Sequence, residues 1–231
     1  MPRALPTGLE RALAHDRARV LALNPDSVSR ETWTRLDRFV ALLLDRQQTM
    51  NLVAASTLPQ LWTRHVADSL QLLALAPAAR RWIDFGSGAG FPGLVIACAL
   101  ADTPASAVHL VESTRKKAAF LADVARELSL PVTVHAERIE DFAAANRVSF
   151  DVVTARAVAP LSKLLGYAIP LLKRGAVGLF PKGQDVGAEL TEASKYWTMR
   201  AELIESKTDP HGRIVVVRQA RKRAKLLIKL K

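Results

Sequence analysis

The sequence predicts a doubly wound α/β fold, in which helices cover both faces of a parallel sheet and a helical cap precedes it. Two observations carry this prediction. Short apolar strands alternate with helical segments between residues 81 and 180, a pattern typical of βαβ units. The 231 residues include 49% hydrophobic and 24% charged side chains, which is ordinary globular usage and excludes disorder, collagen and coiled coil.

The first third of the chain is predicted to be helical. Apolar residues recur at helical spacing through Glu31–Gln48, and Ser29 is suited to cap that helix at its N-terminus. A second helix is expected to begin at Thr57, with Pro59 in the first turn, where its missing N–H costs little. We expect residues 1–78 to form a cap within the same domain.

The segment after the cap is predicted to form the sheet and its helices. The expected strands are Arg81–Phe85, Ala107–Glu112, Val132–His135, Asp151–Ala155 and Ala176–Phe180. The expected helices are Leu94–Leu100, Lys116–Leu128, Leu161–Leu172 and a segment around Glu189–Trp197. Two further β-like runs, Arg200–Ser206 and Arg213–Arg218, flank a turn at Pro210. We assign residues 79–218 to the main domain and 219–231 to a basic C-terminal tail.

The charge balance favours an acidic partner such as nucleic acid. The formal net charge is +11, and residues 218–231 hold seven basic side chains and no acid. Leucines and an isoleucine interleave with these lysines, so a helix on a membrane surface is the alternative for the tail.

Cys98 is the single cysteine, which excludes an intramolecular disulfide and fits a reducing cytosol. The longest apolar run, Leu94–Ala101, is too short to span a membrane, and the histidines show no metal spacing. We expect a cytoplasmic protein without a metal.

A glycine-rich loop, Asp84–Gly93, follows the first predicted strand. Glycine permits positive φ and a close approach of a ligand to the backbone, and the next helix offers unpaired N–H groups. Two patterns fit this loop. Gly88-x-Gly90-x-x-Gly93 matches a dinucleotide fingerprint, whereas Gly86-x-Gly88-x-Gly90, behind the aspartate, is the pattern of S-adenosylmethionine-dependent methyltransferases.

The methyltransferase pattern fits the loop better. Gly86 follows the strand directly, while the dinucleotide pattern would put Pro92 where the helix should already run. Glu112 ends the second predicted strand, and an acid there can accept hydrogen bonds from a ribose diol. The sequence therefore predicts a nucleoside cofactor at this edge of the sheet, with S-adenosylmethionine preferred over NAD.

The sequence lacks residues that some classes of methyl acceptor require, and this limits the acceptor atoms to consider. Methylation at C5 of a pyrimidine needs a cysteine nucleophile, and Cys98 lies in the helix after the glycine loop, where it is expected in the core. Methylation of an exocyclic amine usually shows Asn or Asp before Pro-Pro and an aromatic residue, whereas the fourth strand here leads into Arg156-Ala157-Val158-Ala159-Pro160. Ring nitrogens such as guanine N7 remain, and they carry no proton to remove.

At this point a resemblance to a known family becomes visible. The chain resembles the bacterial small-subunit (16S) ribosomal RNA guanine-N7 methyltransferases, also called glucose-inhibited division protein B, from about residue 51 to 217. The matching blocks are Asn51-Leu52, Arg64-His65-Val66-Ala67-Asp68-Ser69, Asp84 to Gly93, Lys116-Lys117 with Phe120-Leu121, Arg138-Ile139-Glu140-Asp141-Phe142, Arg156-Ala157, Lys182-Gly183, and Arg213 with Val215-Val216-Val217. The family usually has Asp where this chain has Glu112.

The resemblance implies a fold, an activity and a set of site residues. The fold is the Rossmann-like class I methyltransferase sheet, and the activity is methyl transfer from S-adenosylmethionine to a guanine near the decoding region. The implied cofactor-binding residues, with those of the glycine pattern, are Asp84, Gly86, Gly88, Gly90, Phe91, Glu112, Ile139, Glu140 and Arg156. The implied partner is 16S ribosomal RNA or a small-subunit precursor, bound by a monomer. The alternatives are an inactive RNA- or nucleotide-binding module on this fold and an NAD-dependent oxidoreductase.

Several cations and one histidine are predicted to place the RNA. Arg64, His65 and Asp68 share one predicted helix, which we expect to cover the cofactor pocket and to help place the guanine; a surface ion pair between Arg64 and Asp68 is the alternative. Arg156, Lys182 and His65 are predicted to act by positioning, and Lys182 could bind phosphate or guanine O6. Further RNA contacts are expected from the tail residues Arg221, Lys222 and Arg223.

Overall fold

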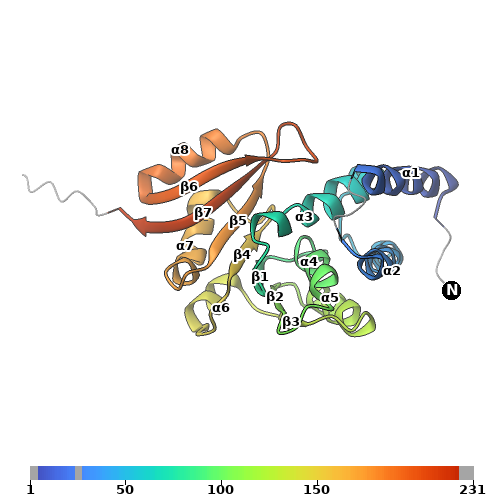
Figure 1. Ribbon diagram of the computed structural model, residues 1–231, viewed down its shortest axis with the longest axis horizontal. Helices are drawn as coiled ribbons and strands as arrows, with labels where there is room; N and C mark the ends of the chain where they lie inside the picture. The colour runs from blue at the N-terminus through green and yellow to red at the C-terminus, as the bar shows by residue number, and fades with distance from the viewer. Residues whose placement is uncertain (1–4, 24–27, 224–231) are drawn as a thin grey trace, which may run out of the picture.

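A seven-stranded sheet runs through the centre of the protein (Figure 1). The computed structural model describes residues 5–23 and 28–223. The strands are β1 (Arg81–Phe85), β2 (Ala107–Val111), β3 (Val132–His135), β4 (Val152–Ala155), β5 (Val177–Lys182), β6 (Trp197–Glu205) and β7 (Arg213–Lys222). Their order is β3-β2-β1-β4-β5-β7-β6, in which the first five are parallel and β7 is antiparallel to both of its neighbours. The predicted doubly wound α/β sheet is confirmed.

Helices cover both faces of this sheet. They are α4 (Gly93–Leu100), α5 (Arg115–Glu127), α6 (Ile139–Ala145), α7 (Leu161–Leu172) and α8 (Val186–Tyr196). Alternate residues of a strand point to opposite faces. Trp82 of β1 therefore packs in the cluster that contains α4 and α5, while Ile83 packs in the cluster that contains α6, α7 and α8. Both side chains are essentially inaccessible to solvent.

The N-terminal helices share a core with the sheet. They are α1 (Thr7–Leu23) and α2 (Arg30–Gln47), and the Ser29 hydroxyl accepts a hydrogen bond from Thr32 N at 3.1 Å, as the predicted N-cap requires. Leu36 and Phe39 of α2 are fully buried in the same cluster as α4. The cap and the sheet therefore share one hydrophobic cluster.

The helix expected from Thr57 onwards is broken into four short pieces. These are η1 (Ala55–Gln60) and η3 (Leu73–Leu75), both 3-10 helices, the π-helical turn η2 (Trp62–Ala67), and one α-helical turn, α3 (Asp68–Leu70). Asp16 of α1 binds both the N–H and the hydroxyl of Thr63. A side chain that inserts between the backbone groups of a helix favours the wider π-helical turn, here η2. Turns of this kind recur at functional sites.

The hairpin strands are longer than the sequence predicted. Strand β7 continues through Lys222. The boundary predicted between residues 218 and 219 therefore falls inside a strand, and of the predicted tail only 224–231 lie outside the described residues. Helix α6 was not predicted, although Glu140 and Asp141 in its first turn are a helix-start signal. No described helix is long and apolar enough to cross a membrane.

Candidate cofactor and acceptor site

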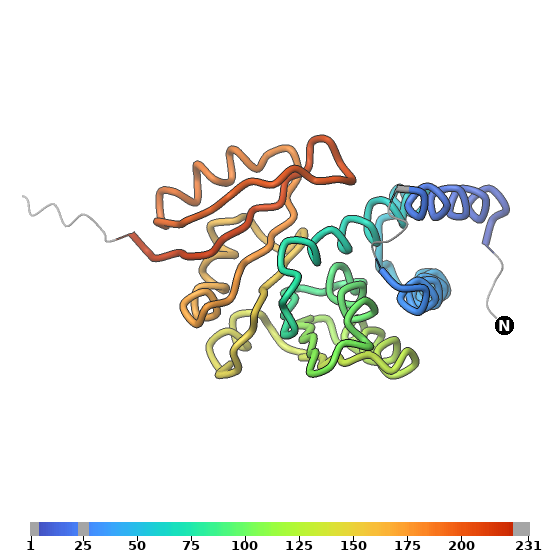
Figure 2. Tube along the Cα trace, in the orientation of Figure 1, coloured from blue at the N-terminus to red at the C-terminus, as the bar shows by residue number. Residues whose placement is uncertain are grey.

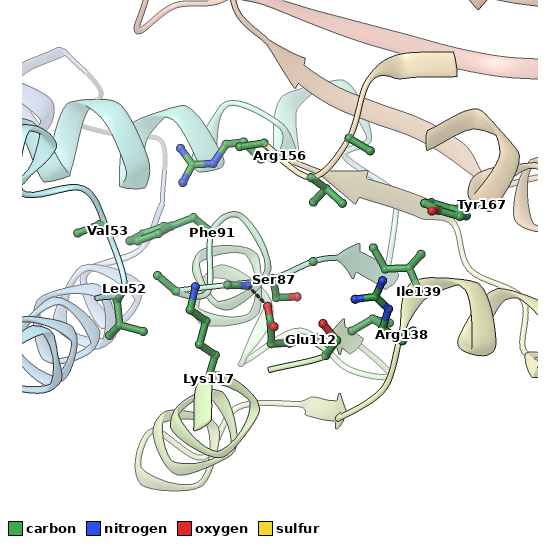
Figure 3. A pocket seen from close by; sticks show the side chains of 18 of the residues that line it. Leu52, Val53, Ser87, Phe91, Glu112, Lys117, Arg138, Ile139, Arg156 and Tyr167 are labelled. Atoms are coloured by element: carbon green, nitrogen blue, oxygen red, sulfur yellow. Dashed lines mark hydrogen bonds between the residues drawn. The ribbon is translucent and has the colours of Figure 1, made fainter. Parts of the chain in front are cut away.

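The carboxyl ends of the five parallel strands meet at one edge of the sheet, where a cavity of about 580 Å³ opens (Figure 3). Ligands of doubly wound folds bind at this edge. The loops after β1, β2, β3 and β4 all contribute to the cavity wall, and so does the cap through Leu52, Val53 and His65. The predicted site residues that line it are Gly86, Gly88, Phe91, Glu112, Ile139, Glu140, Arg156 and His65.

The glycine loop adopts a backbone that only glycine takes easily. Gly86 and Gly88 have φ of +67° and +54°. A Cβ on Gly86 would lie 2.5 Å from Val158 Cγ2, so the loop packs directly against the segment after β4. A Cβ on Gly88 would meet nothing closer than Gly86 O, at 3.8 Å. The wall at Gly88 is therefore open towards the cavity and leaves room for a ligand against bare backbone.

Glu112 lies directly against the glycine loop in the cavity wall. One of its carboxylate oxygens accepts Gly88 N at 2.9 Å, and the other accepts Thr114 N at 2.7 Å (Figure 3). These two backbone bonds fix the carboxylate, which is largely buried. Each oxygen keeps a second lone pair, so the group can still accept hydrogen bonds from a ribose diol.

Two residues of the predicted cofactor set lie behind the cavity wall. Asp84 is fully buried; its oxygens accept hydrogen bonds from the Thr154 hydroxyl at 2.9 Å and from Gly93 N at 3.3 Å. Burial raises the pKa of Asp84 to about 6. Gly90 forms the turn into α4 with φ of +99°. We therefore correct the sequence prediction for both, since they hold the loop in place and do not line the cavity.

The wall on the α6 and α7 side contains residues that the sequence analysis did not single out. Tyr167 of α7 lies beside Ile139, and its hydroxyl donates a hydrogen bond to Glu140 at 2.6 Å, which lowers the pKa of that carboxyl (Figure 3). Lys117 and Arg138 add two cations to the wall. The available signal was that Lys117 lies in the first turn of α5, soon after β2, and that Arg138 lies between β3 and α6. Nothing local marks Tyr167.

Arg156 is the centre of a polar cluster opposite Glu112 (Figure 3). Its guanidinium donates to Arg64 O at 3.0 Å and to His65 Nδ1 at 2.8 Å, and it lies 3.6 Å from Asp68 Oδ2. It also lies 5.4 Å from the centre of the Phe91 ring. Burial lowers the pKa of Arg156, and the charge of Asp68 opposes that shift. Asp68 thus pairs with Arg156, and not with Arg64 as the alternative of a surface ion pair required.

His65 is a neutral hydrogen-bond acceptor in this cluster. A guanidinium can only donate, so Nδ1 must accept from Arg156, and Nε2 carries the proton that faces Thr57 Oγ1 at 3.1 Å. The ring stacks on Phe91 with its centre 5.0 Å away. Burial, with the charges of Arg156 and Arg64, lowers the pKa of His65 to about 3. His65 therefore does not titrate near neutral pH.

Lys182 points at protein groups. Its ammonium lies 2.8 Å from Glu189 Oε2 and donates to Ala159 O at 2.8 Å. The same Glu189 oxygen accepts Leu161 N, at the start of α7, at 2.7 Å. The Lys182–Glu189 ion pair thus holds the segment from Ala159 to Leu161 at both ends. This segment begins two residues after Ala157, which has a positive φ of +55°.

A second cavity of about 960 Å³ adjoins the first across this segment. His65 and the residues from Arg156 to Ala159 line both cavities. Arg64, Lys182 and Arg213 line the second one only. The structure thus places two hollows side by side, with a shared wall that carries the guanidinium of Arg156.

The remaining predicted RNA contacts lie elsewhere. Arg221 and Lys222 end β7, Arg223 follows it, and none of the three lines either cavity. In the described part of the chain, no group of three or more His, Cys, Asp or Glu side chains could hold a metal ion.

Several solved structures with similar folds are O-methyltransferases. The O-methyltransferase TomG from Streptomyces achromogenes, in complex with S-adenosylmethionine, superposes with a TM-score of 0.57 at 18% identity, over 92% of this chain and 99% of that chain. An O-methyltransferase from Bacillus cereus, in complex with S-adenosylhomocysteine, gives a TM-score of 0.57 at 14% identity, over 90% of this chain and 99% of that chain. At such identities the likeness shows the shared class I methyltransferase fold.

Sequence relatives are much closer. A protein of Bradyrhizobium sp. named ribosomal RNA small subunit methyltransferase G is 56% identical over 90% of this chain and 92% of its own length. A protein of Nitrobacter hamburgensis with the same name is 57% identical over 87% of this chain and 77% of its own length. The GidB family, described as rRNA small subunit methyltransferase G, matches residues 32–215. The chain therefore belongs to the GidB family of small-subunit ribosomal RNA methyltransferases.

Proposed function

We propose that this protein transfers a methyl group from S-adenosylmethionine to N7 of a guanine in 16S ribosomal RNA. The observation that carries the proposal is the pair of adjoining cavities at the carboxyl edge of the sheet. One has the bare glycine loop and the buried carboxylate that a nucleoside cofactor needs. The other has room for a base and exposes Arg64 at its wall. Family membership adds the nature of the substrate.

The residues of the first cavity fit S-adenosylmethionine. Glu112 is fixed where it can accept hydrogen bonds from the ribose hydroxyls, while Ile139 and Tyr167 offer apolar surface to a purine. The open wall at Gly88 and the cation of Arg156 suit the amino-acid portion, which carries a carboxylate. When bound, the cofactor supplies an electrophilic methyl group on a sulfonium ion.

The acceptor is proposed to enter the second cavity and to meet the methyl group at the shared wall. Guanine N7 has a free lone pair, so the reaction needs alignment and no proton removal. The surroundings match this requirement, because burial and the charge of Arg156 lower the pKa of His65, and the Nδ1 lone pair already accepts a hydrogen bond from Arg156. Both features make this imidazole a poor proton acceptor. Arg156 binds to His65, the carbonyl of Arg64 and Asp68, so it also couples the cap to the wall.

Lys182 is proposed to act through the shared wall. Its ion pair with Glu189 and its bond to Ala159 O fix the segment after Arg156. Because the ammonium already has two protein partners, this positioning role is better supported than direct binding of guanine O6. A fixed wall matters, since small misplacements of reacting groups cost large factors in rate.

We further propose that the partner is the small ribosomal subunit or a precursor of it, met in the cytoplasm by a monomer. The test uses purified protein, radiolabelled S-adenosylmethionine and small subunits from cells that lack the activity. We expect stoichiometric label on one guanine, located by the strand scission that reduction and aniline produce at N7-methylguanosine. Gly88→Val serves as the inactive control. Label on another atom, or binding of NAD in preference to S-adenosylmethionine, would contradict the proposal, and RNA binding without transfer would favour the inactive module.

A further inference from the structure

The two longest strands form a projecting ribbon that the cofactor site does not use. Strand β7 pairs with β5 from Lys182↔Arg213 to Gly178↔Val217, which is the whole length of the β5 pairing. Beyond Val217 it pairs with β6 alone, and a register shift lies between Arg200 and Ala201. We call this two-stranded extension the basic ribbon; it comprises residues 197–200 and 218–223.

The basic ribbon carries only positive charge. Its five charged side chains are all exposed: Arg200, Arg218, Arg221, Lys222 and Arg223. Within the described residues, no hydrogen bond or ion pair ties any of these side chains to a carboxylate. Five unpaired cations on ten residues make a concentrated site for phosphates.

One face of the ribbon is anchored and the other is open. Trp197 packs against the α7 side of the sheet and donates its indole N–H to Ser162 O at 2.8 Å. Residues directly opposite each other on paired strands share a face. The register Thr198↔Arg221 and Arg200↔Gln219 therefore places Arg200 and Arg221 together on the face opposite to Trp197. Two cations from different strands therefore share the open face of the ribbon.

The antiparallel direction of β7 sets the distance of this pair from the acceptor cavity. Arg213, at the start of β7, lines that cavity, and Arg221 follows eight residues later. At the rise of an antiparallel strand this separates them by about 27 Å. Figures 1 and 2 show β7 running from the hairpin near α3 to the far margin of the fold, on the side away from α1 and α2.

We propose that the basic ribbon is a second RNA contact, which binds the phosphate backbone of the substrate at the end of β7 that lies about 27 Å from Arg213 in the wall of the acceptor cavity. This inference rests on the proposed function. At a rise of about 3.4 Å per nucleotide, a stacked strand needs about eight nucleotides to span the length of β7 between the two contacts. The ribbon then contributes to binding and not to the methyl-transfer step.

The first test compares two charge-matched variants on small subunits. Arg200→Gln/Arg221→Gln removes two ribbon cations, and Arg11→Gln/Arg30→Gln removes two exposed cations from α1 and α2. For the ribbon variant we expect the salt slope of RNA binding to fall by about 1.4–1.8 and KM for the RNA to rise about tenfold at physiological salt, with kcat unchanged. For the control variant neither should change. Equal slopes in both variants would overturn the inference.

The second test locates the contact. Cys98 is buried, and burial raises the pKa of its thiol to about 12, so Gln219→Cys gives a single reactive thiol on the ribbon. An iron chelate attached there should cleave the RNA backbone at nucleotides remote from the methylated guanine, because Arg221 lies about 27 Å along β7 from Arg213 at the acceptor cavity. Cleavage at the guanine itself, or ribbon-dependent binding to anionic vesicles with no RNA cleavage, would refute the inference. Methyl transfer by the same labelled protein tests the proposed function separately.

Discussion

Substitution of Gly88 tests the cofactor site most directly. Its φ of +54° lies in the left-handed region, where a side chain costs about 1–2 kcal/mol. The structure otherwise has room for a Cβ, since the nearest protein atom lies 3.8 Å away. The added carbons of Gly88→Ala and Gly88→Val therefore enter the cavity and not the protein core. The domain should fold, while the space for S-adenosylmethionine shrinks.

The expected loss of affinity is large for valine. We expect Gly88→Val to weaken binding of S-adenosylmethionine at least about 100-fold, which corresponds to about 2.7 kcal/mol, and Gly88→Ala to weaken it less. The free energy of unfolding should fall by only about 1–2 kcal/mol from the backbone strain. Isothermal titration calorimetry measures the first quantity, and denaturant unfolding measures the second.

The chain offers a matched control for the strain. Gly175 also has a positive φ, of +96°, and a Cβ there would meet nothing within 4 Å. It lies before β5, at the other end of the strands from the cavity. Gly175→Ala should therefore lower stability without changing cofactor affinity. Unchanged affinity in Gly88→Val, or equal losses of affinity at both positions, would refute the assignment of the glycine loop.

Three further predictions follow from groups that the structure buries. The pKa of Asp84 is raised above its unfolded value, so the free energy of unfolding should fall as pH rises from about 4 to 6. Asp84→Asn should remove this pH dependence and raise the free energy of unfolding at pH 7 by up to about 3 kcal/mol, as measured by denaturant titration. The pKa of His65 is lowered instead, so stability should be lost as pH falls below about 6.5, less so in His65→Gln, while the rate of methyl transfer stays free of a His65 ionisation between pH 6 and 8. Lys182→Met leaves Glu189 without its cation, so it should lower the free energy of unfolding by about 2 kcal/mol and lower kcat more than the affinity for S-adenosylmethionine. The double variant Lys182→Met/Glu189→Gln should recover part of the stability. Unchanged stability and kcat in Lys182→Met would contradict the positioning role.

Local sequence signals predicted most of the elements because their causes are local. Strand Arg81–Phe85 and helix Leu161–Leu172 have the predicted bounds, and the Ser29 cap forms as expected. The helix expected from Thr57 was wrong in detail, since Asp16 of α1 widens the turn at Thr63. That contact joins residues 47 positions apart, and no periodicity within the segment reports it.

Some features of the candidate site could likewise be predicted from local sequence, and others could not. The sequence could place Gly86, Gly88 and Glu112 together because a parallel sheet brings the residues after its strands to one edge. The same pattern misassigned Asp84, since a motif shows spacing but does not show which side of the loop a carboxylate faces.

The sequence by itself determined the alternation of strands and helices, the glycine loop and the excess of positive charge. Only the tertiary structure decided that Arg156 meets His65, that Lys182 is paired with Glu189, and that the charged end of β7 lies far from the acceptor cavity. The physical reason is that propensity and hydrophobic period act over a few residues. A hydrogen bond between residues 91 positions apart, or the direction of a strand relative to its neighbour, depends instead on how the whole core packs.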